Sequence, residues 1–282
     1  MKHRLKLLVT AAIGVCLVVL FGCTQADNTT VADSEQTAPG QPPDLNGIWQ
    51  AVGSAHWDLE GHSASKGPVT NVLGALGGIP AGMSVVEGGA IPYQPWALAK
   101  RDENRADWNR LDPGVKCYIP GIPRSTYMPF PMQILQSDSK IFIAYEFGSN
   151  SRLIHMDRPG TEADLPSWMG YSLGRWEGDT LVVDVSDQMA ETWFDSAGNF
   201  HGENLQVTER YTLMSSNHIR YEATIEDPDV FTRPWKITMP LYRRMEDNAR
   251  ILEFKCVEFA EDALYGHLRK GAENVEPATD YR

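Results

Sequence analysis

The sequence predicts a mainly all-β protein in which an antiparallel meander closes into a β-barrel. Three observations predict it. Apolar and polar residues alternate with the period of a strand in about ten short segments. Most links between these segments are short and polar, which favours antiparallel order because a parallel pair needs a crossover of about a dozen residues or more. A meander of this length closes into a barrel to remove its two free edges.

A β-hairpin at 170–185 is the clearest of these elements. Residues 170–175 alternate, Trp176 to Asp179 form the turn, and 180–185 continue as an apolar strand. Residues with the same strand character predict the remaining strands at 47–50, 132–136, 141–147, 152–156, 205–213, 219–225, 235–241 and 251–259.

The chain begins with the pattern of a signal segment. Lys2, Arg4 and Lys6 precede an uncharged apolar stretch at 7–22. A single transmembrane anchor is the alternative, but about 16 apolar residues are fewer than the roughly 20 that span a bilayer. We therefore expect a signal peptide.

The end of this stretch, LFGC at 20–23, resembles the bacterial lipoprotein box, in which the cysteine thiol takes a lipid. The resemblance implies removal of 1–22, a lipid on Cys23 and anchoring in the bacterial envelope. Thr24 at the following position favours the outer membrane, with the protein facing the periplasm.

Composition divides the rest of the chain. Residues 23–43 contain almost no large apolar side chain, which predicts a flexible tether. One barrel-like domain is expected at 44–260, followed by a C-terminal tail at 261–282. Within that domain, 53–129 is first glycine-rich and then proline-rich, with a mostly polar helical pattern at 95–110. We interpret 53–129 as an irregular insertion that covers part of the barrel.

Charge and cysteine content limit the possible partners. Removal of 1–22 takes away three basic residues and no acidic one, so the net charge changes from −12 to −15. Such a charge argues against nucleic-acid binding, which needs a basic surface. Cys16 is lost with the signal and Cys23 carries the lipid. Cys117 and Cys256 remain, and an even pair in an oxidising compartment predicts one disulfide, with two buried free thiols as the alternative.

Four side chains are candidates for acid–base catalysis. Strand alternation places Tyr145 and Glu209 inside the barrel, where burial raises a carboxyl pKa. His201 and Glu203 lie close together in the loop before the strand of Glu209, as a base and its orienting acid would. Each pattern has a structural alternative. Glu209 pairs with an interior arginine, or His201 is a hydrogen-bonded loop residue.

His201 and Glu203 are also compatible with two metal ligands. A complete site needs a third ligand, for which His155, Asp157 and Asp195 are the candidates. We expect neither a metal nor another cofactor.

Aromatic and basic side chains are the candidates for ligand binding. Trp193, Phe194 and Phe200 bring apolar surface to the loop at 187–203, which we expect at the barrel mouth beneath the glycine-rich insertion as a mobile cover. Arg152 and Arg210 carry guanidinium groups suited to clamping a polar group of the ligand.

Two resemblances to known families follow from longer motifs. The runs at 167–184 (SWMGYSLGRWEGDTLVVD), at 208–210 (TER) and at 227–235 resemble a family of secreted, mostly uncharacterised bacterial proteins. The resemblance covers roughly residues 44–258 and implies export and a β-rich domain, without catalytic residues. That family carries His-Ser-Glu where this chain has His201, Gly202 and Glu203, so a role that needs the hydroxyl is in doubt.

Gly47-Ile48-Trp49 resembles the first strand of lipocalin-like barrels, whose indole closes one end of the barrel. The resemblance implies an arginine stacked on Trp49. The candidates are Arg152, Arg158, Arg175, Arg210 and Arg233.

Three functions remain open from the sequence. The first is binding of a small hydrophobic or amphipathic molecule in the barrel. The second is cofactor-independent acid–base catalysis on such a molecule, of lyase, isomerase or hydrolase type, and the third is a structural role in the envelope. An apolar pocket favours binding, and convergence of the four acid–base candidates on a cavity favours catalysis. The sequence does not indicate an oligomeric state.

Overall fold

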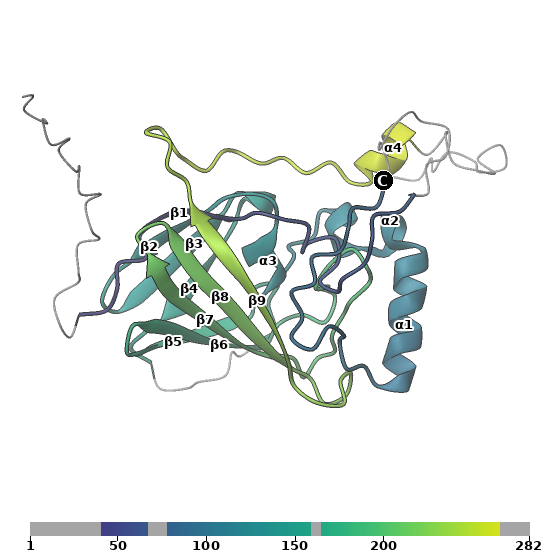
Figure 1. Ribbon diagram of the computed structural model, residues 1–282, viewed down its shortest axis with the longest axis horizontal. Coiled ribbons are helices and arrows are strands. Elements are labelled where there is room, and N and C mark those ends of the chain that lie inside the picture. The colour runs from purple at the N-terminus through teal and green to yellow at the C-terminus, as the bar shows by residue number, and fades with distance from the viewer. Residues whose placement is uncertain (1–40, 67–77, 159–164, 266–282) are drawn as a thin grey trace, which may run out of the picture. The chain divides into compact units, whose positions relative to one another are not determined.

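The computed structural model describes residues 41–66, 78–158 and 165–265, and within them nine β-strands close into a barrel (Figure 1). This confirms the predicted fold class. The described residues all belong to one unit, Gln36–Arg282. None of their helices is both long enough and apolar enough to cross a membrane.

The strands alternate between buried and exposed residues along most of their length, as the sequence pattern predicts. Their bounds are β1 Gly47–Ala51, β2 Met132–Gln136, β3 Lys140–Tyr145, β4 Asn150–His155, β5 Tyr171–Glu177, β6 Thr180–Ser186, β7 Gln206–Ser215, β8 His218–Glu226 and β9 Trp235–Arg243.

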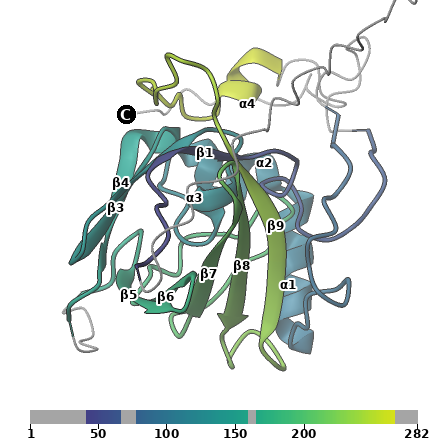
Figure 2. The same ribbon diagram turned by 60° about the vertical axis from the view of Figure 1, so that its left-hand side comes forward.

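The helices are short except for one. They are α1 Pro95–Ala106, α2 Trp108–Leu111, α3 Arg124–Tyr127 and α4 Ala260–Tyr265, with 3₁₀ turns η1 Pro113–Lys116 and η2 Phe147–Ser149. Helices α1 and α2 confirm the helical pattern predicted at 95–110. In Figures 1 and 2, α1 lies on the opposite side of the barrel from β3 and β4.

Each strand pairs with its neighbours in sequence, and β1 pairs with β9 to close the barrel. All pairs are antiparallel except β4 and β5, which run parallel where Ile154 faces Ser172 and His155 faces Leu173. Purely antiparallel order was therefore the wrong prediction at this pair. The chain between them, 156–170, is long enough for a crossover, and part of it lies outside the described residues.

The tenth strand predicted at 251–259 is also absent from the described structure. After β9 the chain continues as an irregular segment into α4. Because β9 already pairs with β8 and β1, the closed barrel offers no free edge to another strand. Cys256 in this segment forms the predicted disulfide with Cys117, which ties the segment to the insertion.

The first and last strands are also joined by a stacked pair of side chains. The guanidinium carbon of Arg243 lies 4.2 Å from the centre of the Trp49 ring, and the Trp49 indole donates to the Leu45 carbonyl at 2.9 Å. The lipocalin-like resemblance thus implied the contact correctly, but none of the five candidate arginines makes it. Gly47 leaves room for Arg243, since a Cβ at this position would collide with the guanidinium.

The insertion packs on one end of the barrel, which we call the covered end. The covered end is the end of the barrel at which Ala51, Met132, Ser186 and Trp235 end or begin the strands β1, β2, β6 and β9. The loop after β6, at 187–205, lies at the same end. The glycine-rich residues 67–77 fall outside the described residues, so the hypothesis of a mobile cover concerns a segment that the structure does not describe.

A buried ion pair fixes the described part of the insertion. Arg124 Nη1 and Nη2 donate to the two carboxylate oxygens of Asp112 at 2.7 and 2.8 Å. Ser196, from the loop after β6, donates to Asp112 at 2.7 Å and accepts from Arg124 at 3.0 Å. The guanidinium and carboxylate therefore link the insertion to that loop through a network with little access to water.

Asp195 adds a second link between the same two segments. It is buried and accepts hydrogen bonds from the Leu59 amide at 3.0 Å and from the Asn199 side chain at 2.7 Å. Burial, together with the nearby charge of Asp58, raises the pKa of Asp195 to about 7. The insertion is thus held to the loop by hydrogen bonds to two buried carboxyl groups.

Candidate functional site

Polar side chains gather inside the barrel between β4 and β7. Arg152 is 5% exposed and Glu209 is 0% exposed, and Arg152 Nη2 donates to Glu209 Oε2 at 2.6 Å. Tyr211 and Tyr221 donate their hydroxyls to Glu209 Oε1 at 2.9 and 2.7 Å. The carboxylate of Glu209 therefore accepts three hydrogen bonds and is balanced by one guanidinium.

Burial alone would lower the pKa of Arg152, but the charge of Glu209 raises it above its ordinary value. The guanidinium is therefore charged at any pH at which the protein is folded. Pairing of Glu209 with an interior arginine was the structural alternative to catalysis, and in the structure Glu209 pairs with Arg152. The ion pair joins two strands that are not neighbours in the barrel.

Two further hydroxyls lie beside this ion pair. Burial raises the pKa of Tyr145, while the charge of Arg152 and the hydroxyl of Thr126 act in the opposite direction. Thr126 acts in the same way on Tyr211, whose pKa burial raises well above its ordinary value. Thr126, on α3, thus lies near both phenols, which stay protonated at neutral pH. We call Arg152, Glu209, Tyr145, Tyr211, Tyr221 and Thr126 the lumen cluster.

The lumen cluster has more hydrogen-bond donors than acceptors. Arg152 Nη2 also donates to Tyr211 Oη at 3.3 Å, but Nε and Nη1 of Arg152 are buried without a partner among the described residues. The hydroxyls of Tyr145 and Thr126 are buried and make no hydrogen bond of good geometry with another described residue, although Thr126 lies close enough to act on both phenols. A guanidinium has five N–H donors, and a buried donor left unpaired costs about 1–3 kcal/mol. The surplus of donors is therefore concentrated on Arg152.

His201 lies outside this cluster, buried in the loop after β6. Its Nδ1 lies 2.8 Å from the Gly202 carbonyl, and its Nε2 lies 2.6 Å from Thr192 Oγ1. A carbonyl can only accept, so Nδ1 carries the proton and Nε2 accepts from Thr192. Gln188 donates to Thr192 at 2.9 Å and orients it. Both nitrogens of His201 therefore have structural partners.

Glu203 does not orient His201. It is exposed and forms no hydrogen bond or ion pair with another described residue. The carboxylates whose charges act on His201 are Asp227 and Glu191. The four acid–base candidates thus occupy three separate places: Tyr145 and Glu209 in the lumen cluster, His201 in the loop, and Glu203 at the surface.

The burial of His201 gives protein stability a defined pH dependence. Burial lowers the pKa of His201 to about 4. Because the folded state disfavours protonation of His201, the neutral imidazole contributes on the order of 3 kcal/mol to the unfolding free energy. This contribution is complete above the unfolded pKa of about 6.5 and is lost as the pH falls toward 4. We expect His201→Gln to flatten the dependence of the unfolding free energy on pH between about 6.5 and 4.

Urea unfolding at pH 7.5, 5.5 and 4.5 measures this slope. His218→Gln is the control, because it makes the same substitution at an exposed histidine. An unchanged slope in the His201 variant would contradict the assignment of a neutral, buried imidazole.

The three aromatic candidates pack at the covered end. Phe194 lies against Phe231 and Trp235, with ring centres 6.3 and 5.4 Å apart. Phe200 stacks on Tyr93 at 6.1 Å, and Trp193 pairs with Phe200 through an isolated β-bridge. Trp193 and Phe194 are buried and Phe200 is half-buried. These rings fill the space between the loop and the insertion, and their neighbours are other protein side chains.

Arg210 lies on the outer surface of the barrel. It donates to Glu177 at 2.8 Å, on the opposite face of β7 from Glu209. Of the two arginines predicted to bind a ligand, only Arg152 faces the lumen.

The candidates for a third metal ligand are also separated. His155 stacks on Tyr171 with ring centres 5.3 Å apart, and Asp195 is occupied by backbone and amide donors. Among the described residues, no three His, Cys, Asp or Glu side chains form a group that could hold a metal ion.

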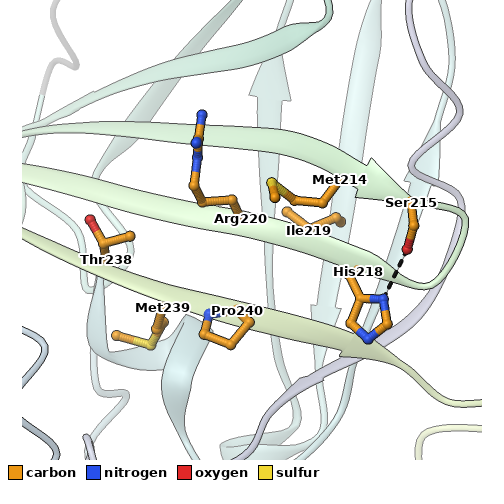
Figure 3. Close-up of a pocket in the computed structure, with 8 residues that line it drawn as sticks. All are labelled: Met214, Ser215, His218, Ile219, Arg220, Thr238, Met239 and Pro240. Carbon is orange, nitrogen blue, oxygen red and sulfur yellow. Dashed lines mark hydrogen bonds between the residues drawn. The ribbon is translucent and has the colours of Figure 1, made fainter.

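An open groove of about 500 Å³ lies on β7, β8 and β9 (Figure 3). Met214, Ile219, Met239 and Pro240 supply its apolar lining; Ser215, His218, Arg220 and Thr238 complete it. Figure 3 shows the Ser215 hydroxyl directed at His218, a hydrogen bond of 2.8 Å, and Arg220 pointing away from the other side chains. None of the predicted site residues lines this groove.

The sequence did not identify four of the buried polar residues as site residues. They are Tyr211, Tyr221, Thr126 and Ser172. Strand alternation was the signal for Tyr211 and Tyr221, since Tyr211 shares a face with Glu209 and Tyr221 faces the interior from β8. Ser172 and Thr126 also carry buried, unpartnered hydroxyls. No sequence pattern indicated Thr126, which belongs to a helix of one turn.

Comparison with known proteins gives no relative for this chain: no family model, no curated protein and no solved structure matches it. Its function therefore has to be inferred from the geometry of the barrel.

Proposed function

We propose that the barrel binds a small amphipathic molecule in its lumen, with an uncharged oxygen acceptor of that molecule on Arg152. The observation that carries the proposal is the surplus of buried donors on the Arg152 guanidinium. Buried donors in folded proteins are nearly always paired. An acceptor supplied by a ligand would satisfy Nε and Nη1, which the described residues leave without partners.

The charge balance of the lumen cluster favours an uncharged ligand. Arg152 and Glu209 already neutralise one another, so a carboxylate ligand would add an uncompensated negative charge at a cost of several kcal/mol. An amine would add donors to a site that lacks acceptors. A carbonyl, ester or amide oxygen meets both requirements, since it accepts hydrogen bonds and carries no charge.

The walls of the barrel suit the apolar part of such a molecule. Ile143, Ile154, Val183 and Ile237 are buried residues of strands that surround the lumen cluster. Each methylene that a ligand buries against such walls contributes about 0.8 kcal/mol. A modest alkyl or ring system would therefore supply most of the affinity, and Arg152 would supply orientation.

A narrow crevice at the covered end is the access route that we propose. Ala51, Gly53, Met83, Tyr127 and Met239 are among its lining residues, and its volume of about 10 Å³ has room for about one water molecule. Met83 packs directly on Gly53. A ligand that enters here would have to displace the flexible side chain of Met83.

The proposal places the protein in the bacterial envelope, with its lipid on Cys23 and its barrel facing the periplasm. The apolar stretch at 7–22 and the LFGC run at 20–23 support this location.

Of the two other functions, acid–base catalysis has less support than binding, and a structural role is supported by a different observation. Acid–base catalysis would need Tyr145, Glu209, His201 and Glu203 together, and they lie in three places. A structural barrel is favoured by the Arg152 to Glu209 hydrogen bond, because an internal ion pair between distant strands would also serve to hold a barrel together.

Native mass spectrometry with three probes of similar chain length tests the proposal: 2-undecanone, decanoic acid and decylamine. At pH 7.5 we expect the ketone to bind at least tenfold more tightly than the carboxylate, with the amine weakest, since one buried charge costs more than the 1.4 kcal/mol that a tenfold ratio represents. The variant Arg152→Met/Glu209→Gln removes both charges together. It should bind the ketone at least tenfold more weakly than the wild type.

A wild-type protein that carries no co-purified molecule and binds none of the probes would contradict the binding function and favour the structural role. Equal binding of the ketone and the carboxylate would contradict the assignment of an uncharged ligand.

A further inference from the structure

Three apolar side chains form a continuous row on the outside of the barrel. Leu135 on β2 faces Phe142 on β3, and Phe142 faces Leu153 on β4. They are 48%, 38% and 38% exposed. Side chains directly opposite each other on neighbouring strands are in contact range, so the row is one apolar surface. We call Leu135, Phe142 and Leu153 the apolar row.

The face that carries the apolar row has no acidic residue. The other outward residues of β2, β3 and β4 are Gln133, Lys140, Ala144, Ser151 and His155. The outward residues of β9 and β1, which adjoin β2, include no acidic residue either, so the acid-free outer face extends over five adjacent strands, and the apolar row distinguishes its β2 to β4 part. The outer face of β6 and β8, by contrast, carries Asp184, Glu222 and Glu226. Phosphate headgroups repel carboxylates and attract lysine, so the chemistry of this face matches a lipid surface.

The described chain begins beside the apolar row. Pro42 lines a groove together with Gln136, Ser137 and Asp138 of the turn between β2 and β3. Gln136 directly follows Leu135. The chain that would connect a lipid on Cys23 to the barrel therefore enters next to this face. Between Cys23 and residue 41 the chain spans at most about 60 Å, so an anchor there keeps the face within reach of the membrane.

From these observations we propose that the outer face of β2, β3 and β4 lies on the lipid surface in which the chain is anchored. This inference rests on the lipid proposed for Cys23 and is independent of what the lumen binds. Full burial of an apolar side chain contributes about 1.5–3 kcal/mol, so three partly buried ones are too few for stable binding by themselves. An anchor makes the contact intramolecular, however, and a weak contact then suffices to set the orientation of the barrel.

Lysine labelling of the full chain in vesicles tests this orientation. The purified lipidated protein is placed in phosphatidylethanolamine and phosphatidylglycerol vesicles, and acetylation of Lys140 is compared with that of Lys100. Lys140 lies on the proposed contact face, and Lys100 lies on α1 at the other side of the barrel. We expect Lys140 to react at least threefold more slowly than Lys100 in vesicles.

Two variants identify the cause of the protection. Phe142→Thr/Leu153→Thr should restore the reactivity of Lys140, because threonine keeps the strand and removes the apolar row. Met214→Thr/Tyr242→Thr replaces two exposed side chains on another face of the barrel and should leave Lys140 protected. Lys140 that reacts as fast as Lys100 in the wild type would overturn the proposal.

Two further outcomes would also overturn it, each for a different reason. An intact mass without a lipid, together with failure to associate with vesicles, would remove the anchor on which the proposal rests. Protection of Lys140 that rises with protein concentration in the absence of vesicles, with a dimer mass, would assign the apolar row to a second copy of the chain. Neither outcome bears on ligand binding in the lumen.

Discussion

Replacing Glu209 with alanine is expected to destabilise the protein by about 3–5 kcal/mol, the cost of leaving one partner of a buried ion pair without its counter-charge. Arg152 would remain charged and buried, and the hydroxyls of Tyr211 and Tyr221 would lose their acceptor. Urea unfolding monitored by tryptophan fluorescence measures the change. Arg152→Met/Glu209→Gln should recover most of the loss, because it removes both charges at similar volume.

The neighbouring Thr208→Ala is the matched control. Thr208 faces outward from the same strand and bonds to Asp184 at 2.9 Å, so its replacement should cost no more than about 1.5 kcal/mol. If Glu209→Ala were as stable as this control, the buried ion pair would not be the interaction that the structure describes.

Replacing Asp112 with alanine is expected to have a similar cost, about 3–5 kcal/mol, because it leaves Arg124 buried without its carboxylate. The effect should be local as well as global. Asp112 connects the insertion to Ser196 in the loop after β6, so hydrogen exchange should rise in both segments before it rises in β7 and β8.

Asp107→Ala is the control for this experiment, since Asp107 forms only an exposed pair with Arg110 at 3.7 Å and its loss should cost less than about 1 kcal/mol. Uniform exchange across the barrel and the insertion in the Asp112 variant would contradict a separate anchoring role for the buried pair.

Strand alternation was sufficient to predict the interior of the barrel. It placed Glu209 and Tyr145 inside, because successive side chains of a strand point to opposite faces. The disulfide between Cys117 and Cys256 followed from counting the cysteines of a chain that was expected in an oxidising compartment. These predictions depended only on local pattern or on composition, so they did not require knowledge of which segments meet in space.

Alternation could not supply the contacts that depend on where elements end or pack. The strand predicted at 235–241 ends two residues before Arg243, and the stack of Arg243 on Trp49 forms because β9 continues to Arg243. Thr126 reaches the lumen cluster from α3, whose four buried residues follow a proline-rich segment that predicts extended chain.

Closeness in sequence was misleading in the loop after β6. His201 and Glu203 are two residues apart, but loops have no fixed period that would place their side chains together. His201 turns inward to Thr192, whereas Glu203 faces solvent. The sequence motif therefore joined two residues that the fold separates.

The Arg152 side-chain resonance offers the most direct test of the central claim, that the lumen binds an acceptor through Arg152. In protein labelled with ¹⁵N-arginine, the Nε–H signal of Arg152 is identified by its loss in Arg152→Met/Glu209→Gln. Addition of 2-undecanone should shift this signal in a saturable way and slow its exchange with water, while the Nε–H signal of Arg124 stays in place. A signal from Arg152 that does not move at any probe concentration, or that moves no more than that of Arg124, would contradict the claim.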